Sequence, residues 1–450
     1  MLKNTDTIAA IATASGRGGI GIIRISGLAT TEICENILGG QIPARQACLK
    51  NFKQNDESHI DSGLAIFFKG PASYTGEDTL ELQGHGGPVV LDMLLKRVLE
   101  LGARLAEPGE FTQRAFLNNK LDLAQAEAVA DIIDAGTSAA AISAQRSLQG
   151  AFSTHINDLQ KQLTHLRLYV ESAIDFSDED IDFLAGDELK AIINTLTKAF
   201  EKLANTAKQG SLLRDGMTVV LAGKPNAGKS SLLNTLAQRD TAIVTEVAGT
   251  TRDVLREQIQ IDGMPVHIID TAGLRETDDI IEQEGVKRAK HAISNADQVL
   301  LVVDDQESAG QDYLSLLKDI PSSIPVTVIY NKIDITGVQP GVYTTNEQTT
   351  IKLSAKQNKG LNLLTDHLKT LMGYNPDEKN IFLARRRHLD ALARSKQFLN
   401  DGIEQLLEYQ AGELFAEDLR LAQQALSEIT GKMTPDDLLG EIFSSFCIGK

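Results

Sequence analysis

Long apolar runs are absent from this chain, and no stretch approaches the roughly 20 residues needed to span a bilayer. The first residues, MLKNTDTIAAIAT, have neither an apolar signal core with a small-residue cleavage site nor the Arg-rich, acid-poor character of a transit peptide. The sequence therefore predicts a cytoplasmic protein without a membrane partner.

Cysteine is also scarce, since Cys34, Cys48 and Cys447 are the only 3 cysteines among 450 residues and none forms a CxxC pair. This spacing argues against a disulfide framework or a cysteine-rich zinc site, and it fits a reducing compartment.

Basic side chains are fewer than acidic ones: 44 Lys and Arg oppose 61 Asp and Glu, which gives a net charge of −17. The field of the whole chain repels polyanions, so any contact with nucleic acid must be local, and we expect no DNA partner. The densest basic run, at 385–388, is typical of a solvated helix face, with a phosphate-binding role as the alternative.

The pattern of apolar residues divides the chain into three kinds of segment. Residues 1–118 alternate short strand-like runs with Gly-rich turns and one amphipathic helix, which is typical of a compact α/β domain. Residues 119–215 and 375–450 have apolar residues three or four apart, as helix bundles do, whereas 216–374 alternate buried strands with helices. The predicted fold is multidomain, α/β plus all-α, with a Ras-like P-loop domain inserted into a discontinuous helical domain.

A phosphate-binding loop is predicted at GKPNAGKS, residues 223–230, which matches GxxxxGK[ST] between a strand and a helix. Glycines let backbone N–H groups face the phosphates, Lys229 reaches the β- and γ-phosphates, and the Ser230 hydroxyl is placed for Mg²⁺. The candidate nucleotide-binding residues here are Asn226, Ala227, Gly228, Lys229, Ser230 and Ser231.

A second phosphate motif, DTAG at 270–273, ends the predicted strand PVHIID. An Asp at a strand terminus can hold Mg²⁺ through water, and a Gly amide can meet a γ-phosphate. The candidates are Asp270, Thr271, Ala272 and Gly273.

The base is predicted to be guanine, because Asp334 of NKID can accept hydrogen bonds from guanine N1–H and its exocyclic amine. Adenine does not present those donors in that way, so GTP rather than ATP is expected. The motif comprises Asn331, Lys332, Ile333 and Asp334, and the later Ser354, Ala355 and Lys356 resemble the loop whose backbone amide meets guanine O6.

Between the two phosphate motifs, GTTRD at 249–253 is a candidate switch segment in which Thr251 would complete the Mg²⁺ shell. Leu274 follows DTAG where small Ras-like GTPases carry a water-orienting Gln, so another group must orient water and a positive charge must be supplied. Asn226 could coordinate a monovalent cation together with oxygens from Thr245 to Thr250, or it could only hydrogen-bond the loop. Water-orienting candidates are Arg275, Glu276, Glu282 and Glu284, among which the residues alone do not choose.

The motifs GKPNAGKSS, GTTRD, DTAGLRE and NKID, read with GRGGIGIIRISG near the start and CIGK at the end, resemble the MnmE (TrmE) family of tRNA-modification GTPases. The resemblance covers essentially the full chain. It implies K⁺ ligands at Asn226, Thr245, Val247 and Thr250, Mg²⁺ ligands at Ser230 and Thr251, and hydrolysis by Glu282 with Lys229. The loop implied to contact nucleotide and cations comprises Thr245, Glu246, Val247, Ala248, Gly249, Thr250 and Thr251.

The same resemblance implies a folate-binding, dimerising N-terminal domain with contacts at Arg24, Glu81, Lys120 and Lys450. Arg24 and Lys120 could pair with the folate glutamate or ring substituents, and Glu81 could accept hydrogen bonds from the pterin; the residues alone would be ordinary surface charges. The donor would be a 5-formyl- or 5,10-methylene-tetrahydrofolate. Cys447 is a family position with an implied catalytic role.

The implied activity is addition of an aminomethyl or carboxymethylaminomethyl group to C5 of the wobble uridine of certain tRNAs. The implied partner is the flavoprotein MnmG, in a heterotetramer built on a homodimer of this chain. Two alternatives remain: a ribosome-associated regulatory GTPase, which does not explain residues 1–118, and an interaction protein with a degenerate nucleotide domain. Intact Lys229, Ser230, Thr251, Asp270 and Asp334 argue against the second.

Overall fold

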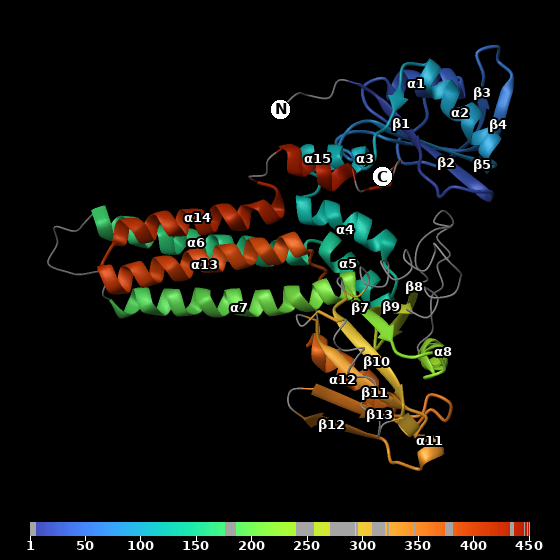
Figure 1. The fold of residues 1–450 in the computed structure, drawn as a ribbon. Helices are drawn as coiled ribbons and strands as arrows, with labels where there is room; N and C mark the ends of the chain where they lie inside the picture. Colours follow the sequence, from blue (N-terminus) through green and yellow to red (C-terminus); the bar gives the residue numbers. More distant parts are fainter. Residues whose placement is uncertain are drawn as a thin grey trace. The chain divides into compact units, whose positions relative to one another are not determined.

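The computed structural model describes residues 6–175, 186–239, 256–270, 293, 296–307, 320–321, 324–345, 348–373, 381–432, 436–444, 446–447 and 449. The chain divides into two compact units (Figure 1). The first comprises Met1–Ile133, Ser147–Phe200 and Ala391–Lys450, and the second comprises Asp134–Arg146 and Glu201–Asp390.

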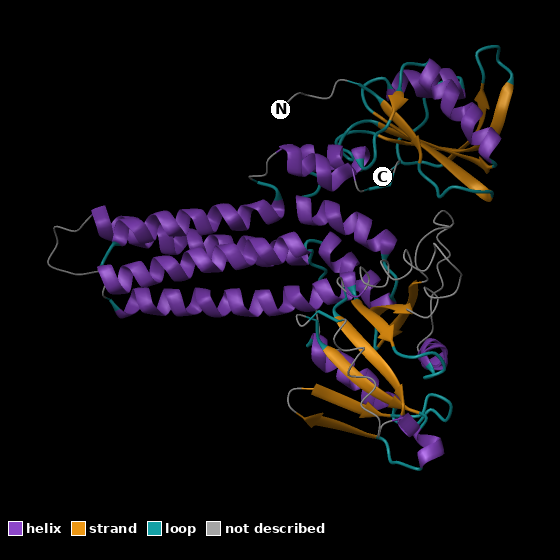
Figure 2. Ribbon diagram, in the orientation of Figure 1, coloured by secondary structure: helices purple, strands orange, loops and turns teal. Residues whose placement is uncertain are grey.

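The first unit contains a six-stranded sheet in the order β3-β4-β5-β2-β1-β6, antiparallel except for the β1–β6 pair. Side chains alternate across the sheet, so Ile23 and Ile25 of β2 are buried while Arg24 between them faces the other side. Figure 2 shows the helices beside this sheet. The elements are β1 (Ile8–Ile11), β2 (Gly18–Ser26), α1 (Thr30–Leu38), β3 (Cys48–Lys53), β4 (His59–Phe68), β5 (Thr79–Gly86), α2 (Pro88–Glu100), β6 (Arg104–Leu105) and α3 (Glu110–Leu117).

Helices α1 and α2 cover the apolar face of this sheet. Ile33 of α1 and Leu94 of α2 are fully buried in one cluster with Ile25, Leu80 and Leu82 of the strands. Because one face of the sheet is filled in this way, polar side chains of β2 and β5 are left on the opposite face.

The helices outside the two sheet-containing regions form two stretches of the chain, one from α4 to α7 and one from α13 to α15. The apolar spacing predicts one helical face with Leu159, Leu163, Leu166, Val170 and Ile174; in α6 the first four are buried and Ile174, near the end of the helix, is half-buried. Helices α6 and α14 lie side by side, where Gln160 Nε2 donates to the Gln423 carbonyl at 3.2 Å. The helices are α4 (Leu123–Asp134), α5 (Ser138–Leu148), α6 (Ala151–Asp175), α7 (Asp187–Asp215), α13 (Arg386–Tyr409), α14 (Gly412–Thr430) and α15 (Asp436–Ser444).

The second unit is built on a seven-stranded sheet in the order β12-β13-β11-β10-β7-β9-β8. The five inner strands are parallel, and the edge strands β8 and β12 run antiparallel to their neighbours. The remaining elements are β7 (Met217–Ala222), α8 (Lys229–Arg239), β8 (Arg256–Ile261), β9 (Met264–Asp270), β10 (Gln298–Asp304), η2 (Asp305–Glu307), β11 (Val326–Asn331), α11 (Ile333–Thr336), β12 (Gly341–Thr345), β13 (Gln348–Lys352) and α12 (Leu361–Met372).

The predicted fold class is therefore confirmed. The runs MTVVLA, PVHIID, QVLLVVD and VTVIYN all form strands, and they are almost continuously apolar because central parallel strands are buried on both faces. Within the described residues, no helix is long and apolar enough to cross a membrane.

Candidate functional site

The predicted nucleotide motifs lie where the parallel strands of the second unit end, along the carboxyl-terminal edge of the sheet. The P-loop follows β7, Asp304 ends β10, Asn331 ends β11 and Ser354 follows β13. Asp304 and Asn331 are paired in register across the neighbouring strands. This edge is where open α/β sheets bind their ligands.

Two glycines give the P-loop its shape. Gly223 has φ +143°, and a Cβ added there would lie 2.2 Å from the Val302 carbonyl oxygen. Gly228 has φ +95°, and its added Cβ would lie 2.2 Å from Asn331 Nδ2. Any other residue at these positions would be strained and would displace a neighbouring strand or the base motif.

The loop opens directly onto α8, whose first residue is Lys229. Lys229 is only 5% exposed, and its ammonium donates to the carbonyl oxygens of Gly223 and Lys224, both at 2.9 Å. Ser230 and Ser231 lie exposed in the first helical turn, where unsatisfied backbone N–H groups favour anions.

Asn331 joins the base motif to the P-loop. Its Nδ2 donates to the Ala227 carbonyl oxygen at 3.1 Å, and its Oδ1 accepts from the Ala355 N–H at 3.0 Å. Asn331 is 2% exposed, so both hydrogen bonds form away from solvent. The structure thus brings together the P-loop, the NKID motif and the Ser354–Lys356 loop.

Asp334, the last residue of the NKID motif, is half-buried, and Ser354 Oγ donates to its Oδ1 at 2.5 Å. Ile333 is buried in α11, whereas Lys356 is exposed. The Ser354 hydroxyl orients this carboxyl group, whose oxygens can accept hydrogen bonds from a guanine edge.

Several predicted residues lie outside the described part of the chain, and the Asp270 side chain does as well, although its backbone ends β9. These residues are Thr245, Glu246, Val247, Ala248, Gly249, Thr250, Thr251, Thr271, Ala272, Gly273, Arg275, Glu276, Glu282, Glu284 and Lys450.

In the first unit, the predicted pair Arg24 and Glu81 face each other on β2 and β5, on the sheet face opposite α1 and α2. Arg24 Nε donates to Glu81 Oε1 at 3.0 Å, and Arg24 Nη1 donates to the Gly449 carbonyl at 3.4 Å. Arg24 therefore links the sheet to the C-terminal tail.

Two aromatic rings that the sequence did not single out lie against Arg24. Its guanidinium carbon is 5.6 Å from the centre of the Tyr74 ring and 5.8 Å from that of Phe111. Tyr74 Oη and Thr112 Oγ1 are hydrogen-bonded at 2.8 Å, and burial raises the pKa of the Tyr74 hydroxyl. Cation–π contact and the ion pair together fix the orientation of Arg24.

Lys120 is exposed, and its ammonium donates to the Pro71 carbonyl at 2.9 Å, in the same loop that carries Tyr74. An added Cβ at Gly76 would lie 3.5 Å from carbons of the Lys120 side chain. The loop 70–76 thus connects the surroundings of Arg24 and of Lys120.

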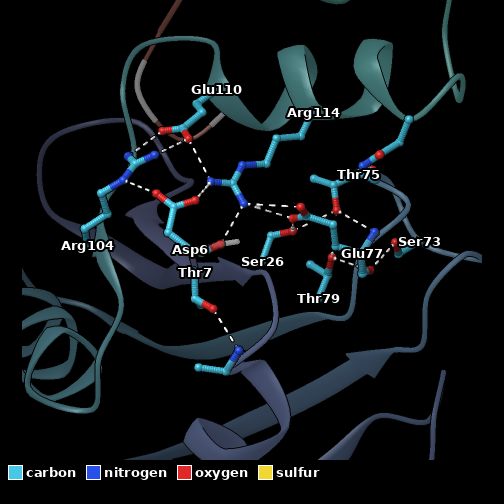
Figure 3. A network of polar contacts seen from close by, with 12 residues as sticks. Asp6, Thr7, Ser26, Ser73, Thr75, Glu77, Thr79, Arg104, Glu110 and Arg114 are labelled. Atoms are coloured by element: carbon cyan, nitrogen blue, oxygen red, sulfur yellow. Dashed lines mark hydrogen bonds and ion pairs between the residues drawn. The ribbon is translucent and has the colours of Figure 1, made fainter. Parts of the chain in front are cut away.

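A charge network centred on the buried residues Arg114 and Glu110 holds α3 to Glu77, just after this loop (Figure 3). Arg114, 2% exposed, donates to Asp6, to Glu77 at 3.2 Å and to Glu110 at 2.9 Å, and Arg104 also binds Glu110. Burial acts to raise the pKa of Glu110, but hydrogen bonds from Arg104, from the Glu107 N–H and from Arg114 hold that pKa below its ordinary value.

Cys447 is exposed, and its carbonyl accepts from the Gly109 N–H at 3.3 Å. Phe443 and Phe446 anchor the preceding residues in a small apolar cluster with Leu123. The tail is therefore seated beside α3, on the same unit as Arg24.

The comparisons with known proteins cover the whole chain. Residues 123–447 match the family described as the MnmE helical domain, and residues 7–120 match the GTP-binding protein TrmE N-terminus. The tRNA modification GTPase MnmE of Yersinia pestis bv. Antiqua (strain Angola) is 56% identical over 454 residues, 100% of each chain. That of Hydrogenovibrio crunogenus is also 56% identical, over 448 residues, covering 100% of this chain and 99% of the relative.

Among solved structures, Aquifex aeolicus Era bound to GDP·AlF4⁻ is 24% identical, with 41% of this chain and 67% of that chain covered. Its TM-score of 0.27 is too low for a comparison of the folds. The assignment rests on the full-length relatives and on the motifs gathered at the sheet edge: the chain is a member of the MnmE family of tRNA modification GTPases.

Proposed function

We propose that this chain is a K⁺-activated GTPase that modifies the wobble uridine of certain tRNAs with a carbon taken from tetrahydrofolate. The observation that carries the GTPase half is the Asn331 contact to Ala227, which joins the guanine motif to the P-loop at 3.1 Å. Identity of 56% over the full length supports the tRNA-modifying half, and it disfavours a ribosome-associated GTPase that would leave residues 1–118 unexplained.

In the nucleotide site, backbone N–H groups at the start of α8 and the Lys229 ammonium would bind the β- and γ-phosphates. Ser230 and Thr251, with Asp270 through water, would hold Mg²⁺, which neutralises phosphate charge. Asp334 would select guanine, and the Ser354–Lys356 loop would meet its O6. Glu282 would orient the attacking water in place of the Gln that Leu274 replaces.

K⁺ would take the place of an arginine finger, held by Asn226, Thr245, Val247 and Thr250. Support comes from Asn226 itself, an exposed P-loop residue with φ +63°. Asn is one of the few residues that adopts this left-handed backbone readily, and its amide oxygen is a hard ligand suited to an alkali cation.

In the first unit, Arg24 and Lys120 would bind the folate glutamate or ring substituents, with Glu81 on the pterin and Lys450 closing the site. The carbon donor would be 5-formyl- or 5,10-methylene-tetrahydrofolate, and exposed Cys447 would act close to it. The Tyr74 and Phe111 rings beside Arg24 offer the flat apolar surface on which a pterin or benzoyl ring stacks.

For assembly, we propose a homodimer through the N-terminal domain, joined by the flavoprotein MnmG in a heterotetramer that binds tRNA in the cytoplasm. Leu49 and Leu64, opposite each other on β3 and β4, are 76% and 40% exposed and suit a dimer contact.

We propose domain boundaries at 1–118, 119–215, 216–374 and 375–450.

Calorimetric titration of 5-formyltetrahydrofolate tests the one-carbon half of the proposal. The parent protein should bind, and a variant carrying Arg24→Ala and Lys120→Ala should not. Lys96→Ala, which removes an exposed cation paired with Asp92 on α2, is the control and should bind like the parent. No binding by the parent at millimolar ligand would refute the folate site and leave a GTPase of other output.

A further inference from the structure

Lys332, the second residue of the NKID motif, makes an ion pair that joins two strand ends. Its Nζ lies 2.7 Å from Asp304 Oδ2, at the carboxyl end of β10. The side chains are 31% and 17% exposed, so the pair is partly shielded from solvent. Shielding strengthens such a contact relative to a fully exposed ion pair.

The carboxylate of Asp304 is itself held in place. Its Oδ1 accepts from the Gln306 N–H at 3.1 Å, at the start of the short turn η2. Burial acts to raise the pKa of Asp304, but the hydrogen bonds from Lys332 and from Gln306 N–H keep the pKa below its ordinary value. The partner that receives Lys332 is thus a fixed, ionised acceptor.

The ion pair fixes the direction of the Lys332 side chain along the sheet edge at which the strands end. Strand β10 lies between β11, which ends at Asn331, and β7, which leads into the P-loop. Lys332 directly follows β11 and its Nζ reaches Asp304 at the end of β10, so its stem runs from the base motif toward the strand that neighbours β7. Asp334, which would bind the edge of guanine, follows Lys332 by two positions and is held by the Ser354 hydroxyl instead.

We propose that Asp304 is a positioning residue for guanine nucleotides: by holding the Lys332 ammonium, it orders the aliphatic stem as a lid over one face of the base. The inference rests on the proposed nucleotide site. A lysine stem covers apolar surface well when its charged head has a polar partner, and its rotamer freedom is lost on binding unless the side chain is already fixed.

The role assigned to Asp304 differs from that of Asp334 in what it recognises. Asp334 would read the donors on the guanine edge, whereas the Lys332 stem would contact the ring face, which guanine and hypoxanthine share. Loss of Asp304 should therefore weaken GDP and inosine diphosphate equally, while loss of Asp334 should change the ratio of the two affinities.

The test is calorimetric titration of GDP and inosine diphosphate into the full chain and its Asp304→Asn variant. Asn has nearly the same shape and keeps an oxygen for the Gln306 N–H, so the change removes mainly the charge. Both dissociation constants should rise by about fivefold, with their ratio and the catalytic rate constant at saturating GTP unchanged. Asp304→Glu should restore most of the affinity.

Asp262→Asn is the matched control, because Asp262 pairs with Lys369 at 2.8 Å in the same unit but at the turn between β8 and β9. It should leave both affinities unchanged. In a Lys332→Ala background, Asp304→Asn should have no further effect, because the group it positions has been removed.

Unchanged GDP affinity in a folded Asp304→Asn protein would overturn the inference, and so would an undiminished loss in the Lys332→Ala background. A changed ratio of GDP to inosine diphosphate would also overturn it, as a sign of a deformed pocket. If Asp304→Asn does not fold, a folded Asp304→Glu protein that has lost most of the parental affinity counts against it. Failure of the parent to bind GDP would instead refute the proposed nucleotide site.

Discussion

The side chain of Asn331 donates from Nδ2 to the carbonyl oxygen of Ala227 at 3.1 Å, so the guanine motif supports the P-loop directly. The two residues are separated by more than a hundred positions in the chain, yet they meet because β11 and the loop after β7 end at the same sheet edge. The same Asn accepts from the Ala355 N–H, which adds the Ser354–Lys356 loop. Base recognition and phosphate binding therefore share one buried side chain.

Replacing Asn331 by Ala should weaken GDP binding at least about tenfold, because the P-loop and the Ser354 loop lose their common support. It also leaves the Ala227 carbonyl and the Ala355 N–H buried without this partner, at a cost of about 1–3 kcal/mol in stability. Calorimetry and thermal unfolding measure the two effects. Thr235→Val removes a hydroxyl that donates within α8 to the Ser231 carbonyl at 2.7 Å and lies 3.3 Å from the Ala355 carbonyl, and it should leave both nearly unchanged.

Replacing Asn226 by Gly tests the cation site without disturbing the backbone, because Gly accepts the φ of +63° that Ala would resist. The parent should hydrolyse GTP faster in K⁺ than in Na⁺ at equal ionic strength, and in Asn226→Gly the ratio of rates should approach one. Asn226→Asp keeps a ligand oxygen and should retain the preference. An Asn226→Gly protein with the parental K⁺ preference would show that Asn226 only hydrogen-bonds the loop.

Replacing Glu110 by Gln should destabilise α3 and its surroundings by about 3 kcal/mol at pH 7, because it breaks a buried network around Arg114. Since folding lowers the pKa of Glu110, its carboxylate stabilises the fold above the ordinary value of 4.5, and this contribution is lost as pH falls through the folded-state pKa. The difference in stability between parent and variant should therefore disappear in acid.

Hydrogen exchange of peptides from α3, measured across a pH series in parent and variant, reports this difference in stability. Glu100→Gln is the control, since Glu100 is 63% exposed and pairs with Arg97 on α2. A gap that stays constant through the acid range would contradict the assigned role of the Glu110 charge.

Replacing Gly210 by Ala should destabilise the second unit by about 3 kcal/mol, because the added Cβ would lie 1.9 Å from the Phe382 carbonyl oxygen. For Gly440 of α15, none of the described side chains lies within 4 Å of the same added carbon, so Gly440→Ala should be neutral or slightly stabilising. Thermal unfolding of the two variants checks the contrast; equal melting temperatures would argue against a close approach of α7 and Phe382.

The sequence predicted best what repeats locally. Apolar spacing identified α6, and continuous apolar runs identified the central strands β7, β9, β10 and β11, because burial on one or both faces imposes those patterns. Strands β8, β12 and β13 were not predicted. They are edge elements or lie next to an edge, where polar side chains interrupt the run.

Contacts between residues far apart in the chain could not be predicted from the sequence. Arg114 meets Asp6, 108 positions away, and nothing in FTQRAFL distinguishes a buried cation from an exposed one. Tyr74 gave a faint signal as an aromatic residue within a Gly- and Ser-rich loop, and Asp304 gave one as an acidic end to QVLLVVD. Arg24 and Glu81 were identified only through the family resemblance, and their pairing in register required the sheet.

The most direct test of the proposed function is a reconstituted reaction with this protein, the flavoprotein partner, GTP, K⁺ and tRNA lacking the modification. The carbon source is 5,10-methylene-tetrahydrofolate carrying ¹³C in its methylene group, with glycine and ammonium supplied in separate reactions. Mass spectrometry of the digested tRNA should find a C5-substituted wobble uridine with one ¹³C, dependent on GTP and lost in the Arg24→Ala, Lys120→Ala variant. A modified uridine without label, or no modified uridine although GTP is hydrolysed, would contradict the account.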